Sequence, residues 1–172
     1  AVIEPSLSAP DGAPRLRAAG YCPVYLRLDH DPLSAPLAEQ LKTAELRVTS
    51  AAGRWTKPGS ATPGETLWEF FHHRDDRLQA PDGALLIPVI VIDQFEELFT
   101  LAQANDAVRA RARLFLSELA DLVENRPPAA FEARLDAGGT DVEAYDFSRN
   151  DYRVLISLRE DYLPHLESLK TG

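Results

Sequence analysis

Three acidic side chains follow the most hydrophobic segment of the chain. Residues 85–92 are aliphatic apart from Pro88, Asp93 ends this run, and Glu96 and Glu97 come three and four positions later. Such a run is typical of a strand buried on both faces of a sheet. An aspartate at its end can bind hydrated Mg²⁺, and a glutamate one turn further on can polarise an attacking water. Asp93 and Glu96 also have the spacing of a capping box, which would bond the first amides of a helix. Both interpretations stay open.

A second hydrophobic run ends in a basic residue. Residues 152–158 predict a strand, and Arg159 follows it directly. Because parallel strands end at the same edge of a sheet, Arg159 is predicted to lie at the edge that carries the acidic residues. An arginine there can contact a γ-phosphate and sense its loss on hydrolysis. The alternative is an ion pair with Glu160, with Asp161 or with one of the glutamates described above.

Hydrophobic periodicity and turn residues predict the elements that position these side chains. Strands are expected at 23–29, 85–92 and 152–158, and helices at 15–20, 35–47, 63–80, 105–125 and after 161. Ser34 is expected to cap the helix at 35–47, and Thr62 the helix that follows. The stretch 48–64 is predicted to be a loop, and 129–151 a loop or insertion. The alternation predicts an α/β domain with a parallel sheet of at least three strands flanked by helices.

Other conspicuous residues are interpreted as structural. His72 and His73 are adjacent, so they point about 100° apart on a helix, and a solvated helix face is favoured over a metal site. Trp68 is assigned to the core or to a contact between domains. Residues 29–31 are interpreted as a turn, and Cys22 as a buried structural thiol.

Composition narrows the class of protein. The chain has 172 residues, with 45% hydrophobic and 26% charged residues, which fits one domain with a hydrophobic core. Its formal net charge of -9 argues against nucleic acid or an anionic membrane as the main partner. No apolar run has the length of a bilayer span, and no signal-peptide pattern is present. A cytoplasmic protein is therefore expected.

Residues 89–99 and 153–163 together resemble the STAND class of P-loop NTPases, most closely the bacterial novel STAND domains. The first segment reads Val-Ile-Val-Ile-Asp-Gln-Phe-Glu-Glu-Leu-Phe and the second Arg-Val-Leu-Ile-Ser-Leu-Arg-Glu-Asp-Tyr-Leu. The resemblance extends over roughly residues 14–169 and implies part of a P-loop NTPase three-layer sandwich. By this resemblance Asp93 is the Walker B residue that binds the Mg²⁺ of ATP. Catalytic roles fall to Glu96 or Glu97, which would activate water, and to Arg159, the sensor.

The phosphate-binding loop of that class, Gly-x-x-x-x-Gly-Lys-Ser/Thr, is absent from the sequence. Residues 1–14 are predicted to be irregular, and residues 15–172 to form a single incomplete NTPase-like domain. The resemblance implies that the intact protein is a nucleotide-controlled signalling or defence switch that uses ATP and Mg²⁺. Binding of ATP by this chain alone is expected to be weak or absent, so neither ATP nor Mg²⁺ is expected to stay bound to it, and it is not expected to hydrolyse ATP. The alternative is a non-catalytic protein-interaction module on a degenerate NTPase scaffold.

The missing loop has a consequence for partners. In the class, the strand before that loop lies beside the strand that ends at the sensor arginine. Without this neighbour, residues 153–158 would form an exposed apolar edge of the kind that proteins usually cover. The expected partners are therefore a second copy of the chain or other domains of the parent protein, with residues 1–4 as a further candidate for pairing.

Overall fold

The structure is a computed structural model in which residues 13–55, 64–101, 105–139 and 142–164 are described. Its main sheet has three strands in the order β1 (Tyr21–Arg27), β4 (Ile87–Asp93) and β5 (Arg153–Ile156), and both pairings are parallel. A separate two-stranded ribbon joins β2 (Arg54–Trp55) antiparallel to β3 (Leu78–Gln79). The predicted α/β class with a parallel sheet flanked by helices is confirmed.

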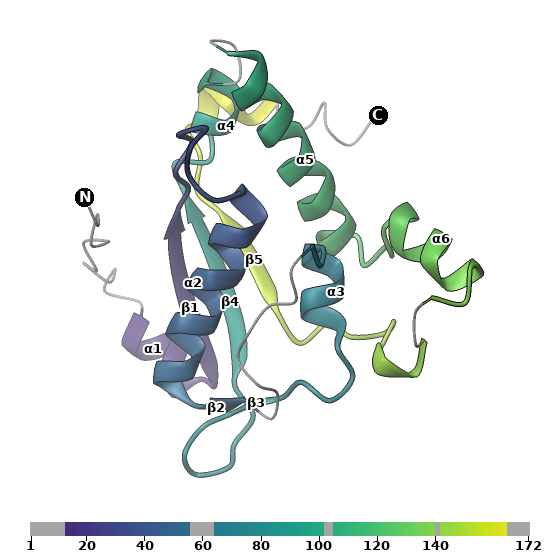
Figure 1. Cartoon of the computed structure of the whole chain (residues 1–172). Helices are drawn as coiled ribbons and strands as arrows, with labels where there is room; N and C mark the ends of the chain where they lie inside the picture. The colour runs from purple at the N-terminus through teal and green to yellow at the C-terminus, as the bar shows by residue number, and fades with distance from the viewer. Residues whose placement is uncertain (1–12, 56–63, 102–104, 140–141, 165–172) are drawn as a thin grey trace.

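Strand β4 occupies the centre of the main sheet, as Figure 1 shows. All of its side chains from Pro88 to Ile92 are buried, which explains the unbroken hydrophobic run in the sequence. The register aligns Asp93 with Arg27 of β1 and Ile92 with Ile156 of β5. All three strands therefore end at one edge of the sheet, called here the carboxyl edge.

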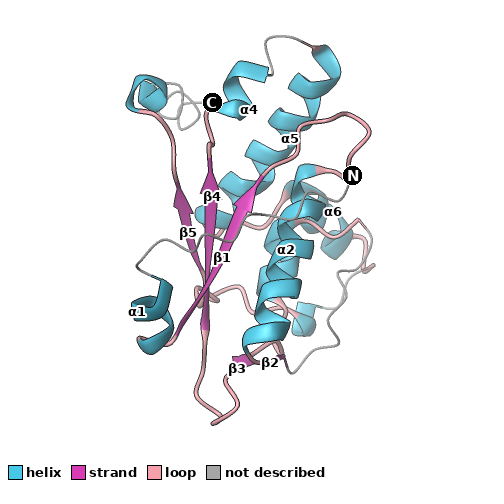
Figure 2. Cartoon of the chain, turned by 90° about the vertical axis from the view of Figure 1, so that its left-hand side faces the viewer, coloured by secondary structure: helices cyan, strands magenta, loops and turns pink. Residues whose placement is uncertain are grey.

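The helices cover the two faces of the sheet unequally. Helices α2 (Leu37–Ala52), α3 (Leu67–His72) and α5 (Asp106–Val123) pack over one face, and the short α1 (Ala13–Ala18) lies on the other (Figures 1 and 2). The core between sheet and helices includes Val24, Ile90, Ile92, Leu41, Phe115 and Leu122. Burial of each large side chain in this layer contributes about 1.5–3 kcal/mol.

The turn between α1 and β1 follows the expected local rule. Gly20 has φ 83, a left-handed conformation that glycine adopts without a steric penalty. Cys22 in β1 is buried, as predicted, and burial raises the pKa of its thiol to about 11. A buried and protonated thiol is a poor nucleophile, which agrees with a structural role.

Two helix starts differ from the prediction. Helix α2 has Pro36 at its N-cap and no side-chain cap, because the Ser34 hydroxyl donates to Asp29 instead. Helix α3 is capped by Thr66, which forms a capping box with Glu69. Thr62, the expected cap, lies outside the described residues. The correct box has the same residue types four positions later, so the local pattern was recognised but misplaced.

The extents of these elements also differ. Helix α2 continues to Ala52 and β2 follows, so the predicted loop at 48–64 is wrong for the part that is described. Helix α3 ends at His72, and Leu78 belongs to β3. By contrast, α5 begins at Asp106, after an Asn105 cap, and ends at Val123, close to the helix predicted at 105–125.

The described part of residues 129–151 is not an irregular loop, so that alternative is wrong, whereas the predicted insertion stays a prediction. These residues contain α6 (Ala129–Asp136) and a 3-10 turn at Val142–Ala144. Phe131 is fully buried against Trp68, with ring centroids 5.1 Å apart, and Tyr145 packs edge-on to Phe131 at 4.9 Å. These aromatic contacts attach the segment to α3. The aromatic residues are irregularly spaced along the sequence, so they show no helical or strand periodicity.

None of the helices in the described ranges is long and apolar enough to span a membrane.

Candidate functional site

The carboxyl edge gathers the residues that the sequence singled out. Strand β4 ends at Asp93, a tight turn leads into α4 (Glu97–Leu101), and Arg159 follows β5 at the start of a 3-10 turn (Glu160–Tyr162). The carboxyl-edge cluster is defined here as Arg27, His30, Asp93, Glu96, Glu97 and Arg159. Figure 1 shows α4 and the end of β5 near one another at the end of the sheet where α5 begins.

Backbone hydrogen bonds place Asp93 and Arg159 at the same edge. The Ser157 N–H donates to the carbonyl of Ile92 at 2.9 Å, and the Ser157 carbonyl accepts from Phe95 N–H at 2.9 Å. Asp93 lies between the two residues that Ser157 contacts, and Arg159 is two residues beyond Ser157. The topological part of the prediction is therefore confirmed, and the chemical roles of the two side chains stay predictions.

The Asp93 carboxylate is exposed at the end of the central strand. Within the described part of the chain it forms no hydrogen bond and no ion pair, although Arg27 is its register partner in β1. An unpaired carboxylate at the carboxyl end of a parallel strand is free to bind a ligand from solvent. Asp93 is thus the group of the cluster most available to a cation.

The turn after Asp93 is strained. Gln94 has φ 54, a left-handed conformation that costs a residue other than glycine about 1–2 kcal/mol. The side-chain oxygen Oε1 of Gln94 and Oε2 of Glu96 are buried without a hydrogen-bond partner. No hydrogen bond joins Glu96 to Asp93 in this region, and α4 begins only at Glu97, so the capping-box alternative is wrong.

Glu97 is already engaged by basic residues from β1 and the loop after it. Its Oε1 accepts from the Arg27 guanidinium at 2.6 Å, and its Oε2 lies 3.9 Å from His30 Nε2. Burial lowers the pKa of His30, and the charges of Glu97 and Asp29 partly oppose this effect. Water activation by Glu97 would require it to leave Arg27. The pair is solvent-accessible, so its rupture costs about 1 kcal/mol or less.

Arg27 and His30 are members of the cluster that the sequence analysis missed. Residues 29–31 do form the predicted turn, since Asp29 Oδ1 accepts from the Asp31 N–H at 3.0 Å. Arg27 and Glu97 are seventy positions apart, and only the β1–β4 register brings them together. The one available signal was that Arg27 lies near the end of the strand predicted at 23–29, as Asp93 lies at the end of the strand predicted at 85–92.

Arg159 forms the alternative contact that the sequence left open. Its Nε and Nη2 donate to the two carboxylate oxygens of Asp161 at 3.1 and 2.9 Å. The Arg159 side chain is 68% exposed and lies 5.8 Å from the centre of the Tyr162 ring. An exposed ion pair of this kind contributes about 0–1 kcal/mol, so the guanidinium remains available to a phosphate.

The charge of the edge favours a cation over a free anion. Acidic groups outnumber basic ones here, since Glu160 and Asp161 add to the cluster. A triphosphate without a metal would be repelled by this edge. Among the described residues, no group of three or more His, Cys, Asp or Glu side chains is arranged to hold a metal ion. Asp93 therefore fits Mg²⁺ only in the usual protein mode, in which phosphates and water supply the remaining ligands.

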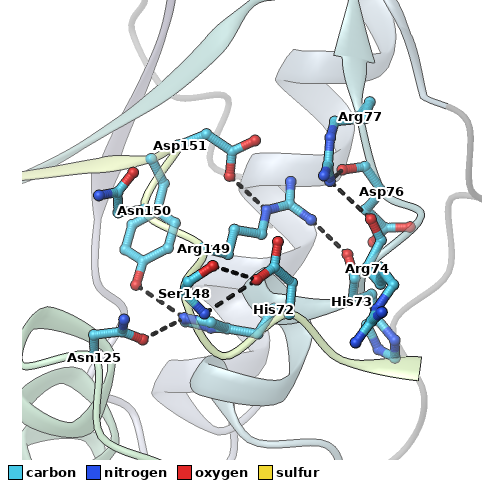
Figure 3. A network of polar contacts seen from close by, with 12 residues as sticks. His72, His73, Arg74, Asp76, Arg77, Asn125, Ser148, Arg149, Asn150 and Asp151 are labelled. Atoms are coloured by element: carbon cyan, nitrogen blue, oxygen red, sulfur yellow. Dashed lines mark hydrogen bonds and ion pairs between the residues drawn. The ribbon is translucent and has the colours of Figure 1, made fainter. Parts of the chain in front are cut away.

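A second polar network lies away from this edge, between α3, the end of α5 and the segment before β5 (Figure 3). His72 is fully buried, so its predicted position on a solvated helix face is wrong. Its Nδ1 lies 2.7 Å from the Trp68 carbonyl oxygen and its Nε2 lies 2.7 Å from Oδ1 of Asn125. Burial lowers the pKa of His72, against the raising effect of these two hydrogen bonds. A neutral ring can donate to only one of the two oxygens.

Asn125 and Arg149 extend this network to the neighbouring segments. Asn125 accepts from Trp68 Nε1 at 3.3 Å and donates to the Phe147 carbonyl at 3.0 Å. Arg149 donates to the His73 carbonyl at 2.6 Å and pairs with Asp151. These contacts bind the end of α3 to Asn125, which precedes residues 129–151, and to the last residues of that segment. His72 and Arg149 are buried, and the groups of the network are paired with one another, which indicates a structural role.

Searches against protein-family models, curated proteins and solved structures found no match to this chain.

Proposed function

We propose that this chain forms the metal-binding and sensor edge of a nucleotide-controlled switch of the STAND class of NTPases. Asp93 would bind the Mg²⁺ of ATP, Arg159 would contact the γ-phosphate, and Glu96 or Glu97 would orient the attacking water. The Mg²⁺ would neutralise phosphate charge when bound. ATP-dependent signalling or defence of this kind would take place in the cytoplasm.

The observation that carries the proposal is the free Asp93 carboxylate at the centre of the carboxyl edge. Ligands of open α/β sheets bind at the carboxyl ends of the strands, and Asp93 ends the strand with neighbours on both sides. Arg159 lies at the same edge in a weak ion pair that a phosphate can replace. The resemblance of residues 89–99 and 153–163 to the STAND class supports the same assignment.

The sequence limits what the chain does alone. It contains no Gly-x-x-x-x-Gly-Lys-Ser/Thr motif, whose backbone amides and lysine hold the phosphates. In place of that motif, the carboxyl-edge cluster supplies only two arginines and His30, whose pKa is lowered. We therefore propose weak metal–nucleotide binding and no ATP hydrolysis by these residues without a phosphate loop from elsewhere.

The competing function is a non-catalytic interaction module on an NTPase-like scaffold. The missing phosphate loop favours it, and so does the engagement of Glu97 by Arg27 and of Arg159 by Asp161. In this case the carboxyl edge would hold its ion pairs permanently. The two functions differ in whether Asp93 binds a divalent cation together with ATP.

A paramagnetic titration distinguishes the two. Mn²⁺ replaces Mg²⁺ and broadens the NMR signals of nearby amides, so weak binding is detectable. With Mn²⁺ and ATP, we expect broadening centred on residues 93–95 and 157–159 that Asp93→Asn removes. Asp136→Asn, at an exposed aspartate on α6, removes the same charge and should leave the broadening intact. Broadening that is absent, or equal in wild type and Asp93→Asn, would reject the NTPase assignment and favour the interaction module.

A further inference from the structure

Strand β5 forms an edge of the main sheet with an open hydrogen-bonding side. Ser157 directs both its N–H and its carbonyl toward β4 and the turn that follows it. Backbone groups alternate along a strand, so those of Val154 and Ile156 point away from β4. Within the described part of the chain no strand pairs with this side of β5. Figure 2 shows β5 at the border of the sheet.

The side chains along β5 make this edge apolar. Leu155 is 55% exposed, although it lies between two residues that pack against the core. Val154 and Ile156 are only partly buried. An exposed apolar edge strand is a template for pairing with another strand. Arg153 at its start is its one charged residue, and it carries no proline, bulge or inward-facing lysine that would oppose such pairing.

We propose that two copies of this chain associate through β5, antiparallel about a two-fold axis at Leu155, to form one continuous six-stranded sheet. The two Leu155 side chains then face each other at the axis. Val154 of each copy pairs with Ile156 of the other through the backbone groups that point outward. An antiparallel pair of identical strands satisfies the isologous geometry of a two-fold dimer.

Charge distinguishes this register from its neighbours. With Leu155 at the axis, Asp151 of each copy lies opposite Arg159 of the other, so two opposite-charge pairs form. A shift of the axis to Ile156 would place Arg153 opposite Arg159 and Asp151 opposite Asp161. A shift to Val154 would place Arg149 opposite Arg159. Like charges directly opposite destabilise a strand pair, so only the first register is complementary at its ends.

The side chains required for these pairs are accessible. Arg159 is 68% exposed and Asp151 is 41% exposed, although each already has a partner within its own chain. The contact is one strand wide, so the dimer is expected to be weak and to depend on protein concentration. This inference does not depend on nucleotide binding.

Sedimentation equilibrium over a concentration series tests the dimer. Wild type is expected to show a monomer–dimer equilibrium, and Leu155→Lys to weaken it by about tenfold or more, because two lysines would meet at the axis. Leu114 is 60% exposed on α5, so Leu114→Lys is the matched control and should dimerise as wild type does. A wild type that is monomeric at all concentrations, or equal behaviour of the two variants, would overturn the proposal.

Charge reversal tests the register. Asp151→Arg and Arg159→Asp are each expected to weaken the dimer, and the double variant to restore it, since the opposite-charge pairs are re-formed with exchanged signs. Failure of the double variant to recover would overturn the register. Asp151 also binds Arg149, so circular dichroism must first show that each variant is folded.

Hydrogen exchange of wild type provides a test that needs no substitution. The amides of Val154 and Ile156 are expected to gain protection as the protein concentration rises, whereas those of β4 do not change. Equal protection of Val154 and Ile156 at all concentrations would mean that the edge stays open or that another segment of the same chain covers it. That result would overturn the dimer.

Discussion

Asn125 provides a quantitative test of the network that connects α3, α5 and residues 129–151. It has φ 51, a left-handed conformation just after α5, and its side chain makes three hydrogen bonds, to Trp68, His72 and Phe147. Each bond contributes about 0.5–1.5 kcal/mol net, but the side chain is exposed and water can replace part of the loss. Removal of all three should therefore cost about 1–3 kcal/mol.

Two substitutions separate the side-chain bonds from the backbone conformation. Asn125→Gly removes the bonds but tolerates a positive φ, so it should lower the free energy of unfolding by about 1–3 kcal/mol. Asn125→Ala also loses the bonds but keeps a Cβ in the left-handed region, so it should be about 1 kcal/mol less stable than Asn125→Gly. Urea denaturation with a common m-value gives both differences.

The control is the asparagine at the other end of the same helix. Asn105 caps α5 through a single bond, from the Ala107 N–H at 2.7 Å, so Asn105→Ala should cost about 1 kcal/mol. Equal stabilities of Asn125→Ala and Asn125→Gly would refute the backbone argument. A loss below about 0.5 kcal/mol in both would refute the role of the network.

Two further predictions concern the site and pH. Gln94→Gly should raise the free energy of unfolding by about 1 kcal/mol in urea denaturation, because it relieves the left-handed φ and removes a buried unpaired oxygen. A variant less stable than wild type would show that the turn is not strained. Burial lowers the pKa of His72, so the unfolded chain binds more protons than the folded one, and stability should fall as the pH drops below about 6.5. His72→Gln should reduce this fall of stability at low pH, measured by denaturation at several pH values. His30→Gln is the control and should retain the part due to His72. An unchanged pH dependence in His72→Gln would show that His72 is not the group responsible.

The sequence predicted the elements whose pattern is local and strong. The hydrophobic run before Asp93 identified the central strand, and the 3.6-residue period of residues 105–125 identified α5. The parallel arrangement then followed from alternation, and it placed Asp93 and Arg159 at one edge. Local rules sufficed here because each strand must bury its side chains to fold.

The contacts that the sequence did not predict all join distant segments. His72 is buried because Tyr152 and Asn125 close over it, and no periodicity within α3 indicates that. Helix α6 depends on one buried side chain, Phe131, so its amphipathic pattern is weak. The pairing of Arg27 with Glu97 depends on strand register. Tertiary contacts overrode local preference in each case.

The central position of β4 has a consequence for the order in which the molecule assembles. Tyr21 aligns with Ile87, 66 positions later, and Val89 aligns with Arg153, 64 positions later. Each pairing therefore requires closure of a long stretch of chain, which slows folding relative to a helical bundle of equal size. During synthesis β1 and β4 can join first, and the sheet reaches its full width only when Arg153–Ile156 has left the ribosome.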